Sequence, residues 1–342
     1  MRAMLLRRLG PLRVDSPPLD LATIPDSEPA PDELLIRVSC CGVCHTELDE
    51  IEGRTSPSRL PIVLGHQVVG RVEALGVDAR GFQIGDRVGV AWIYRADGAC
   101  AYCRRGLENL CVQYRATGRD ANGGYAERMV VPAAFAHAIP ERFADREAAP
   151  LLCAGAIGFR SLRLAGLTDG QSLGLMGFGA SAHLVLHLVR HRLPRTKVFV
   201  FARTEAERRF AQELGASWAG DATEQAPEAL AAIIDTTPAW TPIVRALANL
   251  EPGGRLVVNA IRKEEADKQA LVSIDYARDL WMEREVKSVA NVTREDVREF
   301  LRLAAEIPLR PEVQEYALEQ ANRALVELKT RKIRGAKVLR IQ

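Results

Sequence analysis

A glycine-rich turn between an apolar strand and a helix is the feature that most constrains the fold of this 342-residue chain. The apolar run 173–176 leads into Gly177, Phe178, Gly179, Ala180 and Ser181, and a helical pattern continues through Ala182 to about Arg192. In such a G-x-G-x-x-A turn the first glycine makes the bend and the second lets the backbone approach a diphosphate at the helix N-terminus. The five residues from Gly177 to Ser181 therefore form a predicted dinucleotide site.

The pattern around this turn alternates between strands and helices. We expect a strand at 197–201, a helix at 205–214, a strand at 233–235, and a strand at 255–259 after a turn at Pro252, Gly253 and Gly254. Such alternation is typical of an α/β doubly wound parallel sheet. The central part of the chain is therefore predicted to be a Rossmann domain.

The first 150 residues follow a different pattern, with short strands such as 68–75 and 85–90 separated by glycine and proline turns. This pattern favours a β-rich domain. After about residue 292 the sequence favours helices and ends in a short strand at 337–341. A chain of this length is expected to form two domains.

Composition limits the classes of partner. The chain is 47% hydrophobic and 26% charged, with a formal charge of +2 and interspersed acids and bases. This distribution indicates neither a nucleic-acid partner nor a membrane surface. The N-terminus has only four consecutive apolar residues between its arginines, too few for a signal-peptide core. We therefore expect a cytoplasmic protein that acts on small molecules.

Cysteine and histidine residues provide the strongest functional pattern. Outside a secreted context, seven cysteines favour metal ligation over disulfides. Cys44, His66 and Cys153 each lie in a short local sequence suited to a metal ligand. Two thiolates and one imidazole suit zinc, and a three-ligand set leaves one position open, as in catalytic zinc sites.

These local sequences, GVCHT around Cys44, LGHQVVG around His66 and LCAG around Cys153, resemble those of the zinc-dependent alcohol dehydrogenases of the medium-chain dehydrogenase/reductase superfamily. The resemblance covers essentially the whole chain. It implies a GroES-like catalytic zinc domain at 1–152 and 293–342, with a Rossmann domain at 153–292 inserted into it. It also implies a homodimer or homotetramer.

The activity implied by the resemblance is hydride transfer between NAD(P) and a primary or secondary alcohol, an aldehyde or a ketone. Zinc would polarise the substrate oxygen, and the nicotinamide would carry the hydride. Two alternatives are a zinc-free quinone or enoyl reductase of the same superfamily and a zinc-lobed binding protein without catalysis. The first has no use for all three ligands, and the second leaves the glycine turn unexplained.

The resemblance also implies a structural-zinc lobe, which relatives build from four cysteines. The last three match Cys100, Cys103 and Cys111, whereas Asp97 replaces the first. A carboxylate is a legitimate zinc ligand, so one aspartate and three cysteines form a chemically reasonable structural site. The alternative is a degenerate lobe without metal.

Several residues near Cys44 correspond to the family's proton relay. Thr46 matches the hydroxyl that bonds the substrate oxygen, and His45 matches a residue near the cofactor diphosphate. Glu47 keeps an acidic position behind the ligands. Asp49 stands where many relatives have the outer histidine of the relay, and Gln67 replaces the usual acid after the histidine ligand, which should make zinc slightly more electrophilic.

One further position, Ala336, departs from the family pattern, and another, Trp92, matches it. Ala336 replaces an arginine that contacts the cofactor phosphate in relatives, although Arg334 and Lys337 are close in sequence. Trp92 matches a position that lines the substrate pocket, where it would favour small or slim alcohols. Ordinary core packing is the alternative role for this indole.

The end of the strand at 197–201 bears on cofactor choice. An NAD enzyme places an acid there to bond the adenosine ribose, but Ala202 occupies that position and Arg203 follows. Without the acid, the guanidinium of Arg203 can bind a 2′-phosphate, so NADP is preferred and NAD is possible. Alternatively, Arg203 stacks on the adenine of NAD.

The remaining histidines and cysteines favour structural roles. His183, His187 and His191 are spaced along one face of the predicted helix, but no acid accompanies them in the pattern of a zinc protease, so solvated or packing roles are expected. Cys40 and Cys41 end an apolar strand and are expected to be buried as small hydrophobic residues.

Overall fold

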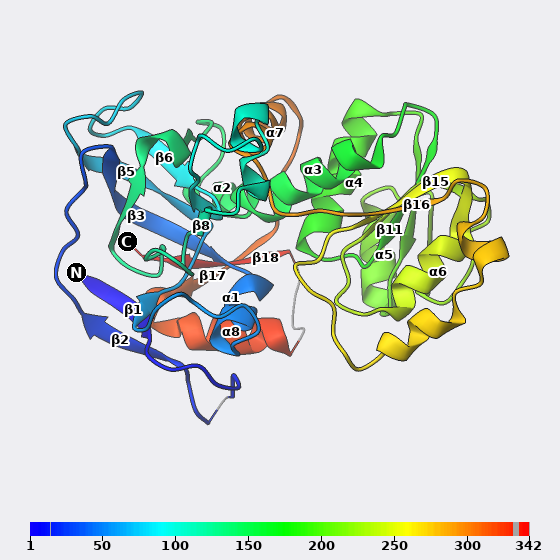
Figure 1. Cartoon of the computed structure of the whole chain (residues 1–342), viewed down its shortest axis with the longest axis horizontal. Helices are drawn as coiled ribbons and strands as arrows, with labels where there is room; N and C mark the ends of the chain where they lie inside the picture. The colour runs from blue at the N-terminus through cyan, green and yellow to red at the C-terminus, as the bar shows by residue number, and fades with distance from the viewer. Residues whose placement is uncertain (14, 331–334, 342) are drawn as a thin grey trace. The chain divides into compact units, whose positions relative to one another are not determined.

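The computed structural model describes residues 1–13, 15–330 and 335–341, and the chain divides into two compact units (Figure 1). Unit 1 comprises residues 1–156 and 292–342, and unit 2 comprises residues 157–291. Unit 2 is therefore inserted between two segments of unit 1.

Unit 1 is built on a seven-stranded sheet in which the order β10-β6-β5-β3-β18-β17 is joined by β9, a second partner of β3. Its strands are β3 (Glu33–Val43), β5 (Val68–Leu75), β6 (Arg87–Val90), β9 (Arg128–Pro132), β10 (Ala136–Ala138), β17 (Val313–Ala317) and β18 (Ala336–Arg340). The long strand β3 is largely buried, which its apolar sequence favours. Cys40 and Cys41 lie within it and are buried, so the packing interpretation of these two residues is confirmed.

Smaller elements surround this sheet. A three-stranded sheet has the order β2-β1-β4, and β7 pairs with β8. Their bounds are β1 (Arg2–Leu6), β2 (Leu19–Thr23), β4 (Ile62–Val63), β7 (Ile93–Arg95) and β8 (Arg115–Ala116). Helices α1 (His45–Ile51) and α8 (Ala321–Lys329) pack against each other, as Figure 1 shows. The other helices of the unit are α2 (Asp145–Ala148) and α7 (Arg294–Glu306), while α3 (Ala154–Ala165) runs across the boundary at residue 156.

Unit 2 contains a fully parallel six-stranded sheet in the order β13-β12-β11-β14-β15-β16. Counted along the chain this is the 3-2-1-4-5-6 order of a Rossmann fold, whose ligand crevice lies where the order reverses, between β11 and β14. The strands are β11 (Ser172–Met176), β12 (Lys197–Phe201), β13 (Trp218–Gly220), β14 (Leu230–Asp235), β15 (Leu250–Val258) and β16 (Glu285–Ser288). The predicted α/β fold class is confirmed.

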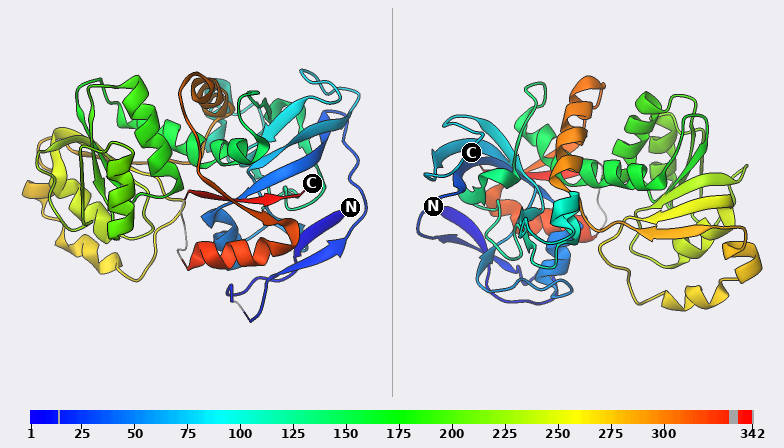
Figure 2. Two further views of the ribbon diagram at one scale, coloured as in Figure 1. Left: turned by 180° about the vertical axis from the view of Figure 1, so that it is seen from behind. Right: turned by 45° about the horizontal axis from the view of Figure 1, so that its top comes forward.

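Helices cover both faces of this sheet (Figure 2). Val198 and Val200 of β12 pack with side chains of α4 (Ala180–Arg192) and α5 (Glu205–Glu213), whereas Phe199 and Phe201 pack with α6 (Thr241–Asn249). Successive residues of a strand point to opposite faces, so a continuous apolar run such as β12 is buried on both sides. The sequence predicted β12 and, within one residue, α5.

Two details of the secondary structure correct the sequence-based expectations. The expected turn at Pro252, Gly253 and Gly254 lies inside β15, where Gly253 has a φ of 73° and the register with β14 shifts. A glycine in left-handed conformation accommodates such an irregularity without ending the strand. The C-terminal segment also contains β17, which pairs in parallel with β18 and was not expected because the sequence after about residue 292 favours helices.

One helical stretch, Asp145–Ala165, is long and apolar enough by composition to resemble a membrane span. About 61% of its most apolar window is buried within the structure, which is typical of a core helix.

Candidate metal centres and cofactor site

The structure brings Cys44, His66 and Cys153 together in unit 1, although they are far apart in sequence. Their ligand atoms all lie within 4.8 Å of one another, and the two Sγ atoms are 4.0 Å apart. Cys44 is the N-cap of α1, His66 lies just before β5, and Cys153 follows a short 3₁₀ turn, η4 (Ala149–Leu152). Three elements thus converge on one small cluster of soft donors, which suits a zinc ion.

Glu47 contacts both His66 and the backbone of Cys44 and so supports this cluster. Its Oε1 atom lies 2.6 Å from Nδ1 of His66, and its Oε2 atom accepts a 2.7 Å hydrogen bond from the backbone N–H of Cys44. The Nε2 atom of His66 is buried and has no protein partner. A carboxylate bound to one imidazole nitrogen leaves the other available to a metal, so Nε2 is the atom of His66 that could bind one.

Charge is concentrated in this buried cluster. A hydrogen bond from Cys153 and the nearby His66 hold the pKa of Cys44 well below its usual range, despite burial. Burial disfavours the His66 cation, but the Glu47 carboxylate and Cys44 outweigh it and raise the pKa of His66. Cys44 therefore favours its thiolate form, which is the form of cysteine that binds a metal.

The other predicted relay residues lie nearby in unit 1. The Thr46 hydroxyl is 3.6 Å from the Cys44 sulfur, and His45 is exposed on the first turn of α1. Asp49 is buried, and its Oδ1 atom accepts a 2.5 Å hydrogen bond from Nε of Arg54. Gln67 is buried against Gly42 so closely that a Cβ at residue 42 would lie 2.7 Å from its Cδ atom.

A second cluster forms from Asp97, Cys100, Cys103 and Cys111, whose ligand atoms also lie within 4.8 Å of one another. The Oδ1 atom of Asp97 accepts hydrogen bonds from the backbone N–H groups of Ala99 (2.8 Å) and Cys100 (2.9 Å). These bonds and the thiols of Cys103 and Cys111 lower the pKa of Asp97. The carboxylate therefore stays ionised and faces the cysteines, as a zinc ligand must.

In unit 2, the glycine turn connects β11 to α4. Gly177 has a φ of 81°, and a Cβ there would lie 3.0 Å from Oγ1 of Thr236. Gly179 is the N-cap of α4, and a Cβ there would meet no atom within 4 Å. The first glycine is therefore required by conformation, whereas the space at the second is available to a ligand at the helix N-terminus.

Two arginines, Arg203 and Arg208, lie near the C-terminal end of β12, the strand end that bears on the choice between NAD and NADP. Ala202 is buried and Arg203 is exposed. Arg208 of α5 donates to the backbone carbonyls of Ala202 (2.8 Å) and Arg203 (3.1 Å), and its guanidinium lies 3.7 Å from Asp221. Sequence reasoning missed Arg208; its place one helical turn after the N-cap Thr204 was the available signal.

The structure also shows the surroundings of Trp92 and Lys337, two residues singled out in the sequence. Trp92 is buried, with its ring 5.3 Å from that of Tyr114 and its Nε1 atom unpartnered. Lys337 is also buried, and its ammonium bonds Gln314, Tyr316 and Glu327. It is therefore not free to replace the phosphate-binding arginine missing at Ala336, and Arg334 lies outside the described residues.

The helix α4 places its three histidines in different surroundings. His183 is buried and lies 3.1 Å from the Gly179 carbonyl through Nδ1, His187 is half-buried, and His191 is exposed. Among the residues that the structure describes, the groups arranged to hold a metal do not include these three. This arrangement agrees with the expected packing and solvated roles.

Comparisons with known proteins agree with this arrangement. Residues 30–141 match the family described as the alcohol dehydrogenase GroES-like domain. The chain is 43% identical to the probable alcohol dehydrogenase AdhA of Mycobacterium tuberculosis, an alignment that covers all of this chain and 97% of that protein.

Solved structures extend the comparison. A cobalt- and zinc-bound thermostable alcohol dehydrogenase from Pyrobaculum aerophilum has a TM-score of 0.87 and 25% identity, covering 100% of this chain and 99% of that chain. An NAD-dependent alcohol dehydrogenase has a TM-score of 0.88 and 25% identity, with both chains fully covered. With its two clusters and its Rossmann unit, the chain therefore belongs to the zinc-dependent alcohol dehydrogenases of the medium-chain dehydrogenase/reductase superfamily.

Proposed function

We propose that the chain interconverts alcohols with aldehydes or ketones at a zinc ion held by Cys44, His66 and Cys153, with NAD(P) as the hydride carrier. The observation that carries the proposal is the buried, unpartnered Nε2 atom of His66, aimed beside two cysteine sulfurs while Glu47 fixes the opposite nitrogen. A zinc-free reductase would leave this costly buried arrangement without a purpose. Metal analysis combined with turnover assays tests the proposal.

The residues around the cluster are assigned to two further roles, positioning of the zinc ligands and proton transfer. When bound, zinc supplies a Lewis acid that stabilises negative charge on the substrate oxygen. Glu47 orients His66 and holds the Cys44 backbone, so two ligands are positioned by one side chain. We assign the Thr46 hydroxyl to accept and pass on the substrate proton. Asp49 is held by Arg54, which supports a carboxylate that orders the outer part of the relay.

We also propose that Asp97, Cys100, Cys103 and Cys111 hold a second, structural zinc. The four ligand atoms and the ionised carboxylate support this set. All four are protein ligands, which fills the tetrahedral coordination and leaves no position for substrate.

Wild-type protein is accordingly expected to contain about two zinc ions per chain, one for each tetrahedral ligand set. The variant Asp97→Cys should retain the second ion more strongly against a chelator, because thiolate is the softer ligand. Elemental analysis before and after graded chelation measures both results. One zinc per chain, with the lobe still ordered, would contradict the structural site.

For the cofactor, we propose a preference for NADP over NAD. Ala202 removes the acid that would repel a 2′-phosphate, and Arg203 is exposed at the same strand end with Arg208 beside it. Arginine binds phosphate through paired, charge-assisted hydrogen bonds.

A charge-assisted hydrogen bond of about 1.5–3 kcal/mol corresponds to roughly 10- to 150-fold in catalytic efficiency. Arg203→Ala should therefore raise the KM for NADPH and barely alter that for NADH. Ala202→Asp should reverse the preference, and Ala202→Asn is its uncharged control. Steady-state kinetics with both cofactors decide the matter, and equal or better efficiency of the wild type with NADH would refute the assignment.

We propose that Trp92 limits the width of the substrate pocket. Its buried ring and its contact with Tyr114 support a rigid wall, although the same contacts also serve the core. Trp92→Ala should raise kcat/KM for branched alcohols relative to ethanol. An unchanged ratio would leave Trp92 as a core residue.

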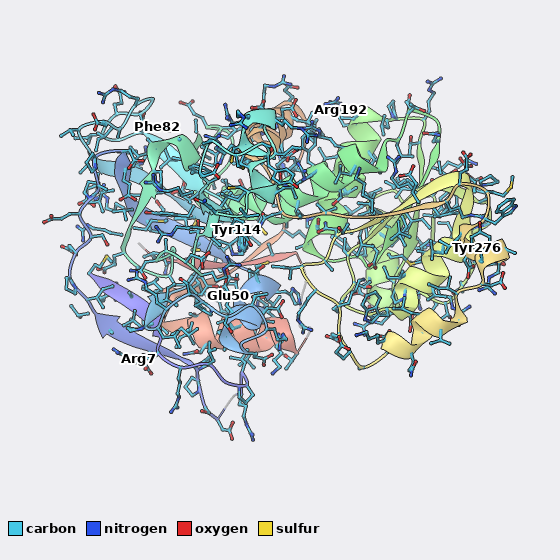
Figure 3. All side chains as sticks on the ribbon, viewed as in Figure 1. Arg7, Glu50, Phe82, Tyr114, Arg192 and Tyr276 are labelled. Atoms are coloured by element: carbon cyan, nitrogen blue, oxygen red, sulfur yellow. The ribbon has the colours of Figure 1, made fainter. Side chains whose placement is uncertain are left out.

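We further propose a cytoplasmic homo-oligomer. The edge strand β16 is exposed at all four positions, and Tyr276, Trp281, Met282 and Val286 are each at least 50% exposed (Figure 3 labels Tyr276). An exposed strand edge with apolar neighbours favours pairing with a second copy. Light scattering of Val286→Lys tests this edge, since a dimer or tetramer that persists would place the interface elsewhere. Cell fractionation tests the location.

A further inference from the structure

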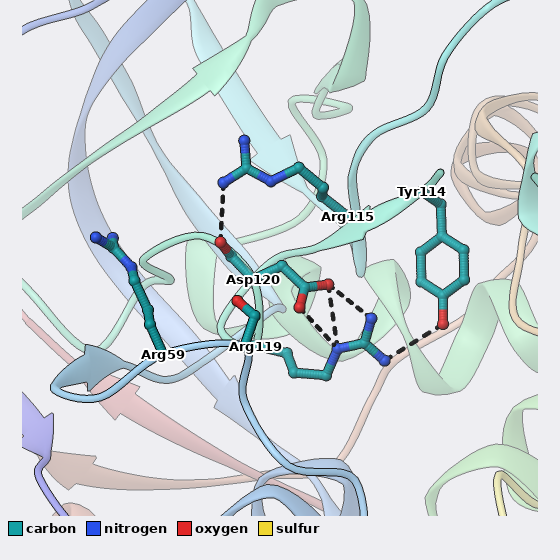
Figure 4. A pocket seen from close by; sticks show the side chains of 6 residues that line it. Arg59, Tyr114, Arg115, Arg119 and Asp120 are labelled. Atoms are coloured by element: carbon teal, nitrogen blue, oxygen red, sulfur yellow. Dashed lines mark hydrogen bonds and ion pairs between the residues drawn. The ribbon is translucent and has the colours of Figure 1, made fainter. Parts of the chain in front are cut away.

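Unit 1 contains a second polar feature that the metal clusters and the cofactor do not use. It is a pocket of about 510 Å³ lined by Ser58, Arg59, Tyr114, Arg115, Arg119 and Asp120 (Figure 4). The lining contains three guanidinium groups and one carboxylate, and only the guanidinium of Arg119 bonds that carboxylate. A pocket built for the chain of a simple alcohol would instead be mostly apolar.

Asp120 neutralises only one of the three arginines. Its carboxylate bonds Arg119, with a shortest distance of 2.6 Å between Oδ2 and Nη2, and Nη1 of Arg119 lies 3.3 Å from the Tyr114 hydroxyl. Arg115 donates to the backbone carbonyl of Asp120 at 2.9 Å, and Arg59 is exposed. Among the described residues, neither Arg59 nor Arg115 has a carboxylate within ion-pair distance. The pocket therefore keeps an excess of positive charge.

Arg119 connects this pocket with the catalytic region. Its guanidinium carbon lies 5.2 Å from the ring centroid of Trp92 and 5.3 Å from that of Tyr114. Arg119 thus lies against the two aromatic rings, those of Trp92 and Tyr114, that are proposed to form a wall of the substrate pocket.

We propose that this pocket binds an oxyanionic group at the far end of the substrate, so that the preferred alcohols and aldehydes carry a carboxylate or a phosphate ester. The guanidinium fork matches both groups through paired hydrogen bonds. Because the pocket is open to solvent, the anion keeps part of its hydration and its binding costs little desolvation. This inference rests on the proposed function and specifies its substrate class.

The test compares aldehydes of two to eight carbons in matched pairs, one of each pair ending in a methyl group and the other in a carboxylate. The wild-type holoenzyme should show a higher kcat/KM for the carboxylated member at one or more chain lengths, by roughly tenfold for a single charge-assisted contact. Phosphate-ended aldehydes form a second arm, which shows which oxyanion is preferred. Turnover of the methyl-ended series separately tests the proposed function.

Three variants test whether a preference for aldehydes that end in a carboxylate or a phosphate depends on this pocket. Arg59→Gln and Arg115→Gln should each reduce it, while Asp120→Asn should increase it by removing the only carboxylate of the lining. Arg37→Gln is the matched control, since Arg37 is exposed on β3 and does not line the pocket. A charge preference at no chain length, or one that survives both arginine variants, would overturn the inference even if the methyl-ended aldehydes are turned over normally.

Discussion

Replacing Cys44, His66 or Cys153 with alanine is expected to reduce turnover by at least about 10³-fold, because a Lewis acid at the reacting oxygen contributes several kcal/mol. Each variant should lose the catalytic zinc and keep the second one. Since the ligands converge from three separate elements, the loss of one side chain leaves the surrounding strands paired. Parallel measurements of zinc content, circular dichroism and kcat check this result.

Cys40→Ala is the matched control for the cysteine variants. Cys40 is buried in β3 and belongs to neither metal cluster, so its removal should cost packing energy and leave zinc content and most turnover intact. Cys44→Ala could instead bind no catalytic zinc yet keep a turnover rate within about tenfold of wild type, which corresponds to only about 1.4 kcal/mol in activation free energy. The assigned role of the cluster would then be wrong.

Thr46→Val is expected to lower kcat by about 10²-fold or more, the usual contribution of a positioned proton-transfer group. Valine keeps the shape of threonine and removes only the hydroxyl, which lies 3.6 Å from the Cys44 sulfur and not in the core. Zinc content should therefore stay unchanged. Steady-state kinetics with metal-quantified protein measure the effect.

The conservative variant Thr46→Ser separates proton transfer from packing. Serine restores the hydroxyl, so kcat should return toward the wild-type value while Thr46→Val stays slow. If the rate of Thr46→Val falls by no more than about threefold, or about 0.7 kcal/mol, Thr46 is a packing residue and protons leave by another route.

The Rossmann unit was predictable because its local patterns are strong. Gly177 must adopt a positive φ, and the apolar run of β12 can be buried only between two helical layers. The Pro252 segment was misread because a glycine bulge and a turn share the same sequence signal. The strand β17 was missed because its five residues, VQEYA, have no clear apolar–polar alternation, and its pairing with β18 makes it a strand.

The candidate site was less predictable from local sequence patterns than the Rossmann unit. No spacing rule relates Cys153 to Cys44, which are 109 residues apart, so their proximity came from family resemblance and not from periodicity. The double contact of Glu47 with His66 and the Cys44 backbone depends on tertiary packing. The same is true of the stacking of Arg119 on Trp92, because Arg119 lies in a loop whose sequence gives no sign of its neighbours.

The central claim is that a zinc ion on Cys44, His66 and Cys153 is required for turnover. Its most direct test is to remove zinc from the wild-type protein, measure kcat, and then add back zinc alone while counting bound ions. We predict that activity disappears with the catalytic ion and returns as that single site is refilled. Near-normal activity in protein shown to be free of metal would contradict the account.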